Sequence, residues 1–315
     1  MHNKLIVILG QTASGKTGLS IKLAKKIALS GVEGFGGVEI VSADSRQVYK
    51  GLNIGSGKIT KQEMRGISHH LLDVANPKRK FSVAQYQKLA TKKIKDIQKR
   101  GRLPFLVGGT GFYIQSIVDG IVLPEVKPSW KLRKKLEKKS VKELFLMLKK
   151  LDPVRASNID SKNPRRLIRA IEIIKTTGKP IPPPRSHSRE CEHEILQIGI
   201  KKSPGQLKKS IHKRLLKRMP GIIMEVKKLH SKGLYWKRLE ELGLEYRFVA
   251  QYLQNKLSYE EMLSKLQKEI EHFSKRQMTW FSAHGGSASG GKHNPRIRWV
   301  KNQREAEKLV KNFIK

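Results

Sequence analysis

The stretch KLIVILGQTASGKTGLS, residues 4–20, decides the fold of this 315-residue chain. Its first part, Lys4–Leu9, is a short apolar run with β-branched residues, typical of a strand buried in a parallel sheet. Gly10–Thr17 then fits the pattern G-x-x-x-x-G-K-[ST], and Thr17–Leu29 has apolar residues at helical spacing. A strand, a glycine-rich loop and a helix in this order predict a phosphate-binding loop in an α/β protein.

The loop has the groups that a bound phosphate needs. Its glycines let the backbone N–H groups point at phosphate oxygens, and the following helix adds its N-terminal dipole. Lys16 supplies a positive charge, and Thr17 a hydroxyl for a magnesium ion. We therefore expect phosphate contacts from eight consecutive residues: Gly10, Gln11, Thr12, Ala13, Ser14, Gly15, Lys16 and Thr17.

Further strands alternate with helices along the chain. Apolar runs at 38–42 and 103–107 predict two strands, with a long amphipathic helix at 81–101 between them. A helix is expected from 108 to 117, a returning strand at 194–201, and a short final strand at 296–300 before a terminal helix. Such alternation with short connections predicts an α/β fold with a parallel, P-loop NTPase-like sheet.

The character of the sequence changes after residue 124. Residues 125–190 are lysine-rich and helical in pattern, which predicts an all-helical domain inserted into a core made of 1–124 and 191–315. Residues 205–280 are also expected to be helical, and Ser258 with Glu261 predicts a capping box. The glycine-rich segments 30–37 and 284–295 are expected to be a surface loop and a flexible linker.

Composition restricts the class of protein. The 66 Lys and Arg residues against 26 Asp and Glu give a formal charge of +40, which favours polyanionic partners, although a solvated lysine-rich surface is the alternative. Cys191 is the only cysteine, so an internal disulfide and a cysteine-cluster zinc site are excluded. No apolar span reaches 18 residues and no signal peptide is recognisable, so we expect a cytoplasmic protein without membrane contact.

Polar residues follow the second and third predicted strands, where ligands bind in open α/β sheets. Asp44 leads the run DSRQVY, and its carboxylate could take a proton from an attacking amine or hydroxyl; the alternative is a turn cap. Thr110 lies in the turn GGTG, where its hydroxyl could bind a bridging phosphate oxygen. Both are expected near the phosphate-binding loop.

Two helical segments carry cations suited to RNA. Arg165 and Arg169 share a helix face, opposite the core-facing Leu167, Ile171 and Ile174. The run KRQMTW at 275–280 places cations beside an aromatic ring that could stack on a base. The alternatives are a solvated basic face for the first segment and a core position for Trp280 in the second.

Together these segments resemble the tRNA dimethylallyltransferase (tRNA isopentenyltransferase) family of bacterial type. The matching runs are GQTASGKT (10–17), DSRQVYKGLNIGSGK (44–58), HHLLD (69–73), GGTGFY (108–113), NPRRLIRAIE (163–172) and KRQMTW (275–280), in family order. Four departures stand out: Gln11 replaces a usual Pro, Gly57 replaces a usual Ala, the loop 30–37 is longer than expected, and Leu242–Tyr246 departs from the family pattern.

The resemblance implies a reaction, two substrates and a cofactor. Dimethylallyl diphosphate and Mg²⁺ would bind at the phosphate loop without ATP, and the adenosine 3′-adjacent to the anticodon would be flipped into the site and alkylated at its N6 amine. Asp44 would be the general base, Thr110 would hold the bridging oxygen, and Lys16 would neutralise the leaving diphosphate, with Thr17 on the metal. The partners implied are the tRNA anticodon stem-loop and the prenyl donor, with the enzyme expected as a monomer.

The resemblance also implies which residues touch tRNA. The matching positions are Asp44, Ser45, Arg46, Gln47, Thr110, Arg165, Arg166, Arg169, Gly243, Tyr246, Arg247, Lys275, Arg276, Gln277 and Trp280. Two other functions remain open from the residues alone. A P-loop kinase or NTPase acting on a small phosphate acceptor would leave the basic segments unexplained. A non-catalytic RNA-binding protein would leave Asp44 and the phosphate loop unexplained.

Overall fold

The computed structural model describes residues 3–29, 35–121, 124, 126–181, 193–283 and 296–315. Contacts divide the chain into two compact units, Met1–Val118 with Glu192–Lys315, and Asp119–Cys191. The segment predicted as an inserted helical domain falls inside the second unit. The expected flexible linker at 284–295, and residues 30–34 of the expected surface loop, lie outside the described residues.

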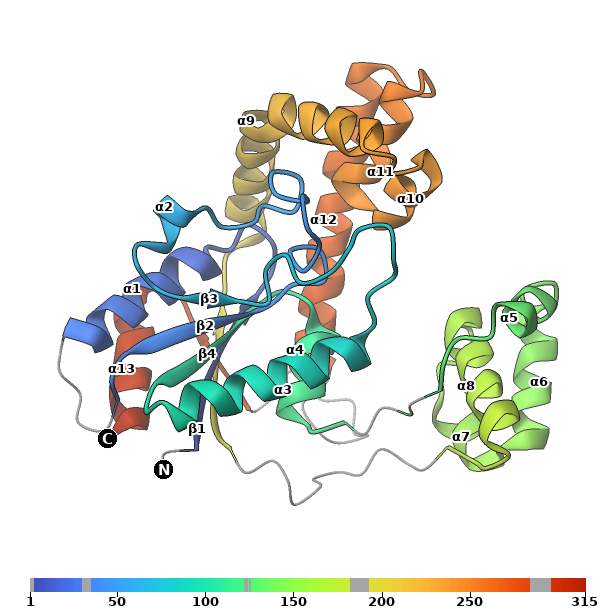
Figure 1. Ribbon diagram of the computed structural model, residues 1–315, viewed down its shortest axis with the longest axis horizontal. Helices are drawn as coiled ribbons and strands as arrows, with labels where there is room; N and C mark the ends of the chain where they lie inside the picture. Colours follow the sequence, from blue (N-terminus) through green and yellow to red (C-terminus); the bar gives the residue numbers. More distant parts are fainter. Residues whose placement is uncertain (1–2, 30–34, 122–123, 125, 182–192, 284–295) are drawn as a thin grey trace. The chain divides into compact units, whose positions relative to one another are not determined.

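The first unit contains a sheet in which every described strand pairing is parallel (Figure 1). Its strands have the order β3-β2-β4-β1-β5-β6. They span β1 Lys4–Gly10, β2 Val38–Ala43, β3 His69–His70, β4 Leu103–Gly108, β5 Glu194–Ile200 and β6 Ile297–Val300. The parallel α/β architecture predicted from the strand–helix alternation is confirmed.

Side chains of β1 alternate between two cores, as the two-residue period of a strand requires. Leu5, Val7 and Leu9 pack on one face of the sheet with residues of α3 (Val83–Lys99), α4 (Gly111–Val118), α9 (Pro204–Ser231) and α12 (Tyr259–Ala283). Ile6 and Ile8 pack on the other face, with residues of α1 (Lys16–Leu29) and α13 (Gln303–Ile314). Helices therefore cover both faces, which explains why β1 is apolar without interruption.

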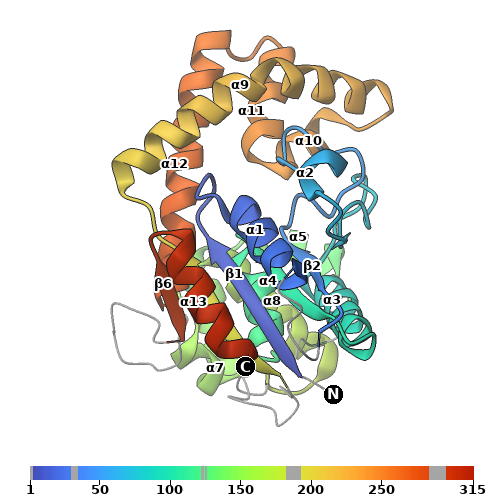
Figure 2. The same cartoon turned by 90° about the vertical axis from the view of Figure 1, so that its left-hand side faces the viewer.

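Helices of the first unit alternate with its strands, and α9 to α12 lie in sequence between β5 and β6 (Figures 1 and 2). Their bounds are α1 Lys16–Leu29, α2 Lys61–Met64, α3 Val83–Lys99, α4 Gly111–Val118, α9 Pro204–Ser231, α10 Trp236–Leu242, α11 Leu244–Leu253, α12 Tyr259–Ala283 and α13 Gln303–Ile314. None of the helices in the described ranges has the length and apolar character that a membrane crossing needs.

Capping residues begin several of these helices where the sequence predicted. Ser82 caps α3 in a capping box with Gln85. Ser258 and Glu261 exchange hydrogen bonds of 2.9 Å and 3.2 Å at the start of α12. The helix expected from residue 108 begins three residues later, at Gly111, because Gly108 still pairs with Ala43 of β2.

The described residues of the second unit form helices joined by loops, with no strand among them. It comprises α5 Trp130–Leu136, α6 Val141–Leu151, α7 Pro153–Asn158 and α8 Pro164–Thr177. Leu144, Leu148, Leu167 and Ile171 form the centre of its core and are fully buried. Asn163 caps α8 and Pro164 opens it, so the start of this helix lies where its sequence placed it.

Candidate active site

Three loops lie at the carboxyl ends of adjacent strands, on one edge of the sheet. Residues 11–15 follow β1, residues from Asp44 follow β2, and Gly109 with Thr110 follows β4. Gly108 allows the loops after β2 and β4 to approach closely, since a Cβ at this position would collide with the carbonyl oxygen of Ala43. The Thr110 N–H then donates to the same carbonyl at 3.2 Å. The topology thus brings the predicted phosphate, carboxylate and threonine loops to one edge.

The loop after β1 has the tight backbone of a phosphate-binding loop. Ala13 and Gly15 both have positive φ, of 57° and 98°. The N–H of Ser14 donates to the carbonyl oxygen of Gln11 at 3.3 Å, and the Ser14 hydroxyl is buried without a hydrogen-bond partner among the described residues. An unsatisfied hydroxyl in such a loop fits an external oxygen acceptor or donor.

Lys16 points back into this loop. Its Nζ donates a 2.6 Å hydrogen bond to the carbonyl oxygen of Gln11. Burial lowers the pKa of Lys16 to about 8; the nearby Asp44 carboxylate opposes this shift, and Arg214 reinforces it. Because burial disfavours the charged form of this amine, an arriving anion stabilises it more than it would a fully hydrated lysine.

Asp44 is both a turn cap and a candidate base. Its Oδ1 accepts from the N–H groups of Arg46 and Gln47 at 2.8 and 3.2 Å. The alternative of a capping Asp is thus correct for Oδ1, while Oδ2 accepts no hydrogen bond from the described residues. Thr110 is tied to the same loop, because its Oγ1 accepts from the Ser45 N–H at 3.0 Å.

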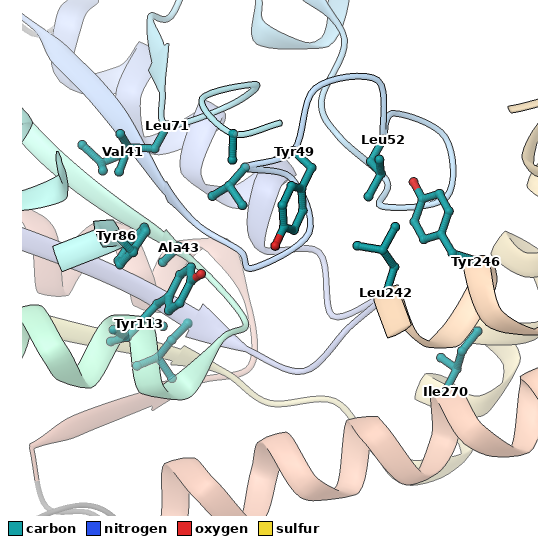
Figure 3. Close-up of a cluster of buried hydrophobic side chains, with 14 of the residues drawn as sticks. Val41, Ala43, Tyr49, Leu52, Leu71, Tyr86, Tyr113, Leu242, Tyr246 and Ile270 are labelled. Carbon is teal, nitrogen blue, oxygen red and sulfur yellow. The ribbon is translucent and has the colours of Figure 1, made fainter. Parts of the chain in front are cut away.

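Two stacked tyrosines lie beneath this loop (Figure 3). The rings of Tyr86 and Tyr113 are 3.9 Å apart between centroids and inclined by 14°. The Tyr86 hydroxyl donates to the carbonyl oxygen of Ser42 at 3.1 Å, which fixes the end of β2. Burial raises the pKa of both hydroxyls, with the Asp44 carboxylate adding to the shift, so both tyrosines stay neutral.

Helix α9 adds two arginines that the sequence reasoning missed. Arg214 is close enough to Lys16 to help lower its pKa, and Arg218 donates to the carbonyl oxygen of Gly55 at 2.9 Å. Burial lowers the pKa of Arg218, and the neighbouring Arg214 contributes. Their spacing of four residues on one helix face was the signal available, but a solvated basic face has the same pattern.

Lys202 is a third missed cation. It follows β5, and its Nζ donates to the carbonyl oxygen of Ala13 at 3.3 Å. Its position just after a strand that pairs with β1 could have identified it, by the same reasoning that identified Asp44. Lys16, Lys202 and Arg214 surround the phosphate loop with positive charge.

Two departures from the family pattern are explained by these arginines. The Arg214 guanidinium lies against Gly57, whose φ is +61°, and a Cβ there would collide with it. Glu245, in the departing run LGLEY, is a half-buried carboxylate near both arginines. Burial raises the pKa of Glu245, and Arg218 opposes the shift.

The residues expected to touch tRNA divide by exposure. Arg247, Lys275 and Arg276 are exposed, and Trp280 is half-buried with an edge contact to Phe112 at 6.0 Å between ring centroids. Two residues expected at the RNA surface are buried instead, namely Tyr246 and Gln277, because their polar groups bind other parts of the protein. The half-buried set comprises Asp44, Ser45, Arg46, Gln47, Thr110 and Gly243.

Arg46 and Gln47 are held by bonds inside the protein. The Arg46 Nε donates to the carbonyl oxygen of Leu242 at 2.5 Å, at the end of α10. Gln47 Nε2 donates to the carbonyl oxygen of Gly57 at 3.3 Å. Both side chains therefore order the loop after β2.

The arginines of the second unit also differ from one another. Arg165 and Arg166 are exposed, while Arg169 donates to Glu172 at 2.6 Å and to the carbonyl oxygen of Val126 at 2.9 Å. Glu172 is fully buried and also binds Arg133. Arg169 therefore stabilises the helical unit. Its guanidinium is already bonded to Glu172 and Val126, so any contact with RNA would compete with those bonds.

The donors available to a metal ion are few. Thr17 is exposed at the start of α1. The Asp44 carboxylate lies close enough to Lys16 to act on its pKa. The described residues contain no group of three or more His, Cys, Asp or Glu side chains placed to hold a metal. A hydroxyl and one carboxylate suit Mg²⁺ carried by phosphate oxygens of a ligand.

The arrangement can bind a small polyphosphate and remove a proton beside it. Backbone N–H groups, Lys16 and Arg214 favour anionic oxygens, and Asp44 stands next to them as an acceptor. A nucleophile with an exchangeable proton could attack a group attached to that phosphate. The geometry alone leaves the transferred group open.

Comparison with known proteins identifies the relatives of the chain. The IPP transferase family model matches residues 47–284. The tRNA dimethylallyltransferase of Carboxydothermus hydrogenoformans is 37% identical, with 100% of this chain and 97% of the relative aligned. That of Anoxybacillus flavithermus is 40% identical over 89% of this chain and 88% of the relative.

Solved structures agree with the sequence relatives. The tRNA isopentenylpyrophosphate transferase of Bacillus halodurans superposes with a TM-score of 0.69 at 33% identity, over 99% of this chain and 97% of that one. A eukaryotic dimethylallyltransferase described as acting on tRNA gives a TM-score of 0.76 at 23% identity, over 98% and 77% of the two chains. The second likeness shows the shared fold alone.

Proposed function

This chain belongs to the IPP transferase family, and on that premise we propose that it transfers a dimethylallyl group from dimethylallyl diphosphate to tRNA. The acceptor is the exocyclic N6 amine of the adenosine 3′-adjacent to the anticodon, and the product is N6-dimethylallyladenosine. Convergence of Lys16, Asp44 and Thr110 at one sheet edge is the observation that supports this activity.

The diphosphate binds in the loop formed by residues 10–17. Its oxygens accept from the loop N–H groups, from the buried Ser14 hydroxyl and from Lys16, which exchanges the Gln11 carbonyl for the ligand. Arg214 and Lys202 add positive charge beside the loop. Negative charge grows on the diphosphate as the allylic C–O bond breaks, so these cations stabilise the transition state more than the bound donor.

Asp44 accepts the proton that the amine loses. The N6 nitrogen attacks the allylic carbon, a C–N bond forms, and the diphosphate leaves with the electrons of the C–O bond. The Oδ1 hydrogen bonds hold the carboxylate in place and leave Oδ2 to take the proton. Thr110, fixed by the Ser45 N–H, directs its hydroxyl proton to the bridging oxygen.

Mg²⁺ fits beside Thr17 and would neutralise diphosphate charge when bound. The tRNA anticodon stem-loop is the macromolecular substrate, and Arg165, Arg166, Arg247, Lys275 and Arg276 are the exposed cations proposed to contact its phosphates. Trp280 lies beside Gly111 and Phe112 and could stack on a base near the reactive adenosine.

The test is a single-enzyme reaction with unmodified tRNA, magnesium and dimethylallyl diphosphate, without ATP. Nucleoside mass spectrometry should detect prenylated adenosine with the wild type. Asp44→Ala should reduce the rate by about 10²–10⁴-fold, the usual contribution of a general base. ATP hydrolysis with no prenylated adenosine would instead indicate a P-loop kinase or NTPase.

A further inference from the structure

Gln11 gives the phosphate loop an attachment that a proline could not provide. Its Nε2 donates to the backbone oxygen of Ser274 at 3.0 Å and to the Ser274 hydroxyl at 2.9 Å. Both residues are buried, at 7% and 2% exposure, so water does not compete for these bonds. The side chain thus ties residue 11 to α12, which lies more than 260 residues away in the sequence.

Gln277, one turn further along α12, holds two loops at once. Its Oε1 accepts from the Thr12 N–H at 2.8 Å, and its Nε2 donates to the carbonyl oxygen of Gly109 at 2.8 Å. The amide therefore connects the phosphate loop to the loop that carries Thr110. Moving either loop away from α12 would leave buried donors and acceptors without partners, which is a strong constraint on both loops.

The main chain of Gln11 continues this connection to the proposed leaving-group site. Its carbonyl oxygen accepts from Lys16 Nζ at 2.6 Å. The side chain of Gln11 is fixed on α12 while its carbonyl holds the lysine amine. A change in the position of α12 therefore moves the carbonyl that Lys16 must release when diphosphate binds.

The same turn of α12 presents cations on its other face. Lys275 and Arg276 stand between Ser274 and Gln277 in sequence, and both are exposed. A hydrogen-bonded helical turn moves as one body, so RNA phosphates bound to these cations would fix the side chains on the opposite face. RNA contact and loop geometry are thereby linked through one turn.

We infer that Gln11 is a positioning residue that couples RNA bound on α12 to the diphosphate site. The inference rests on the proposed function, since it takes the exposed face of α12 as an RNA-binding surface. RNA bound to Lys275 and Arg276 restrains α12. The hydrogen bonds of Gln11 and Gln277 restrain residues 11, 12 and 109 in turn. Diphosphate then binds a loop that is already ordered, so binding loses less conformational entropy. By thermodynamic linkage, diphosphate must raise the affinity for RNA by the same factor.

The experiment measures this factor with inorganic diphosphate and magnesium as the probe. Calorimetry gives the diphosphate Kd with and without an unmodified anticodon stem-loop, and the stem-loop Kd with and without diphosphate. In the wild type both ratios should agree and exceed about 5-fold, the lower end of typical coupling. In Gln11→Leu, which keeps the bulk and removes the amide, both ratios should fall towards 1.

Controls separate positioning from folding. Gln267→Ala removes a polar side chain of α12 that bonds His212 and Glu271, away from the loops, and should keep the wild-type ratio. If Gln11→Leu does not fold, Gln11→Pro decides, because it removes the amide donor while keeping the carbonyl that binds Lys16. A wild-type ratio of 1, or an unchanged ratio in the Gln11 variant, would overturn the coupling.

Failure of the coupling and failure of the proposed function give different results. Wild-type protein that makes prenylated adenosine but shows no coupling would overturn only the role of Gln11. Protein that couples the two ligands, loses the coupling in Gln11→Leu, and makes no prenylated adenosine would support the role of Gln11 as a link and contradict the proposed reaction.

Discussion

Lys16 combines two properties that oppose each other in most proteins: it is a cation needed for anion binding, and burial removes much of its hydration. Its pKa of about 8 leaves it mostly protonated at neutral pH. The diphosphate should raise that pKa again, because a bound anion favours the charged amine. Binding is therefore linked to proton uptake above neutral pH.

This linkage predicts a pH dependence of donor affinity. The free enzyme loses the Lys16 proton as pH rises through about 8, so kcat/KM for the donor should fall by up to tenfold per pH unit above that value. Lys16→Arg should lower kcat/KM but remove this alkaline fall, because arginine stays charged throughout. An alkaline fall of the same position and slope in Lys16→Arg would show that another group titrates.

At the scale of single residues, the sequence could predict Lys16, Asp44 and Thr110 because each follows a recognisable apolar strand. It could not predict Arg214 and Arg218, because nothing in a helical sequence distinguishes a cation facing a site from one facing water. The burial of Gln277 was equally hidden. The two residues before Gln277 in KRQMTW are charged, and only the path of α12 across two loops shows which face turns inward.

At the scale of elements, helix α9 holds the chain between β2 and β3 through one carboxylate. Glu225 accepts from the N–H groups of Asn53, Ile54 and Gly55 at 2.9, 2.6 and 3.0 Å. The Tyr246 hydroxyl adds a fourth bond at 2.8 Å from α11. Pro220 lies inside α9, and Figure 1 shows the helix bending, as proline inside a helix causes.

Glu225→Ala should therefore destabilise the protein by about 2–4 kcal/mol, since bonds to a charged acceptor contribute about 1.5–3 kcal/mol and water partly replaces exposed ones. Urea unfolding measures this change. Glu225→Gln should cost less, because its amide oxygen still accepts. Tyr246→Phe should destabilise the wild type but have little further effect in Glu225→Ala; additive effects would mean that the two groups do not interact.

Strands were predictable where they are buried, and helices where they are long and begin at a cap. β1, β2, β4 and β5 are short apolar runs, and α3 and α12 begin at capping boxes. Two short elements were missed. β3 is only His69–His70, two polar residues that become a strand by pairing with β2, and α2 is a single four-residue turn at Lys61–Met64.

At the scale of the whole molecule, the proposed RNA cations lie in both compact units, while the phosphate loop lies in one. Arg165 and Arg166 are exposed on α8, and removing them should not disturb the sheet edge. Arg169 is different, because it neutralises the buried Glu172. Truncating Arg169 would break a buried ion pair and destabilise its unit.

Arg165→Ala and Arg166→Ala should each weaken tRNA binding and reduce the slope of log affinity against log salt by roughly 1, with diphosphate affinity unchanged. Filter binding over a salt series measures the slope. Lys22→Ala, an exposed cation of α1, removes the same charge elsewhere and serves as the control. Equal slope changes in all three variants would mean that the overall charge, rather than a local contact, attracts the RNA.

The order of strands in the sheet has a consequence for synthesis of the chain. β1 lies between β4 and β5, yet β4 ends at Gly108 and β5 at Ile200. A ribosome adding about 5–20 residues per second needs roughly 5–20 s to make the residues between those points. During that interval the growing chain displays one unpaired edge of β1, whose Leu5–Leu9 run is wholly apolar. This edge of β1 stays open until β5 emerges and pairs with it from Lys4 to Gly10.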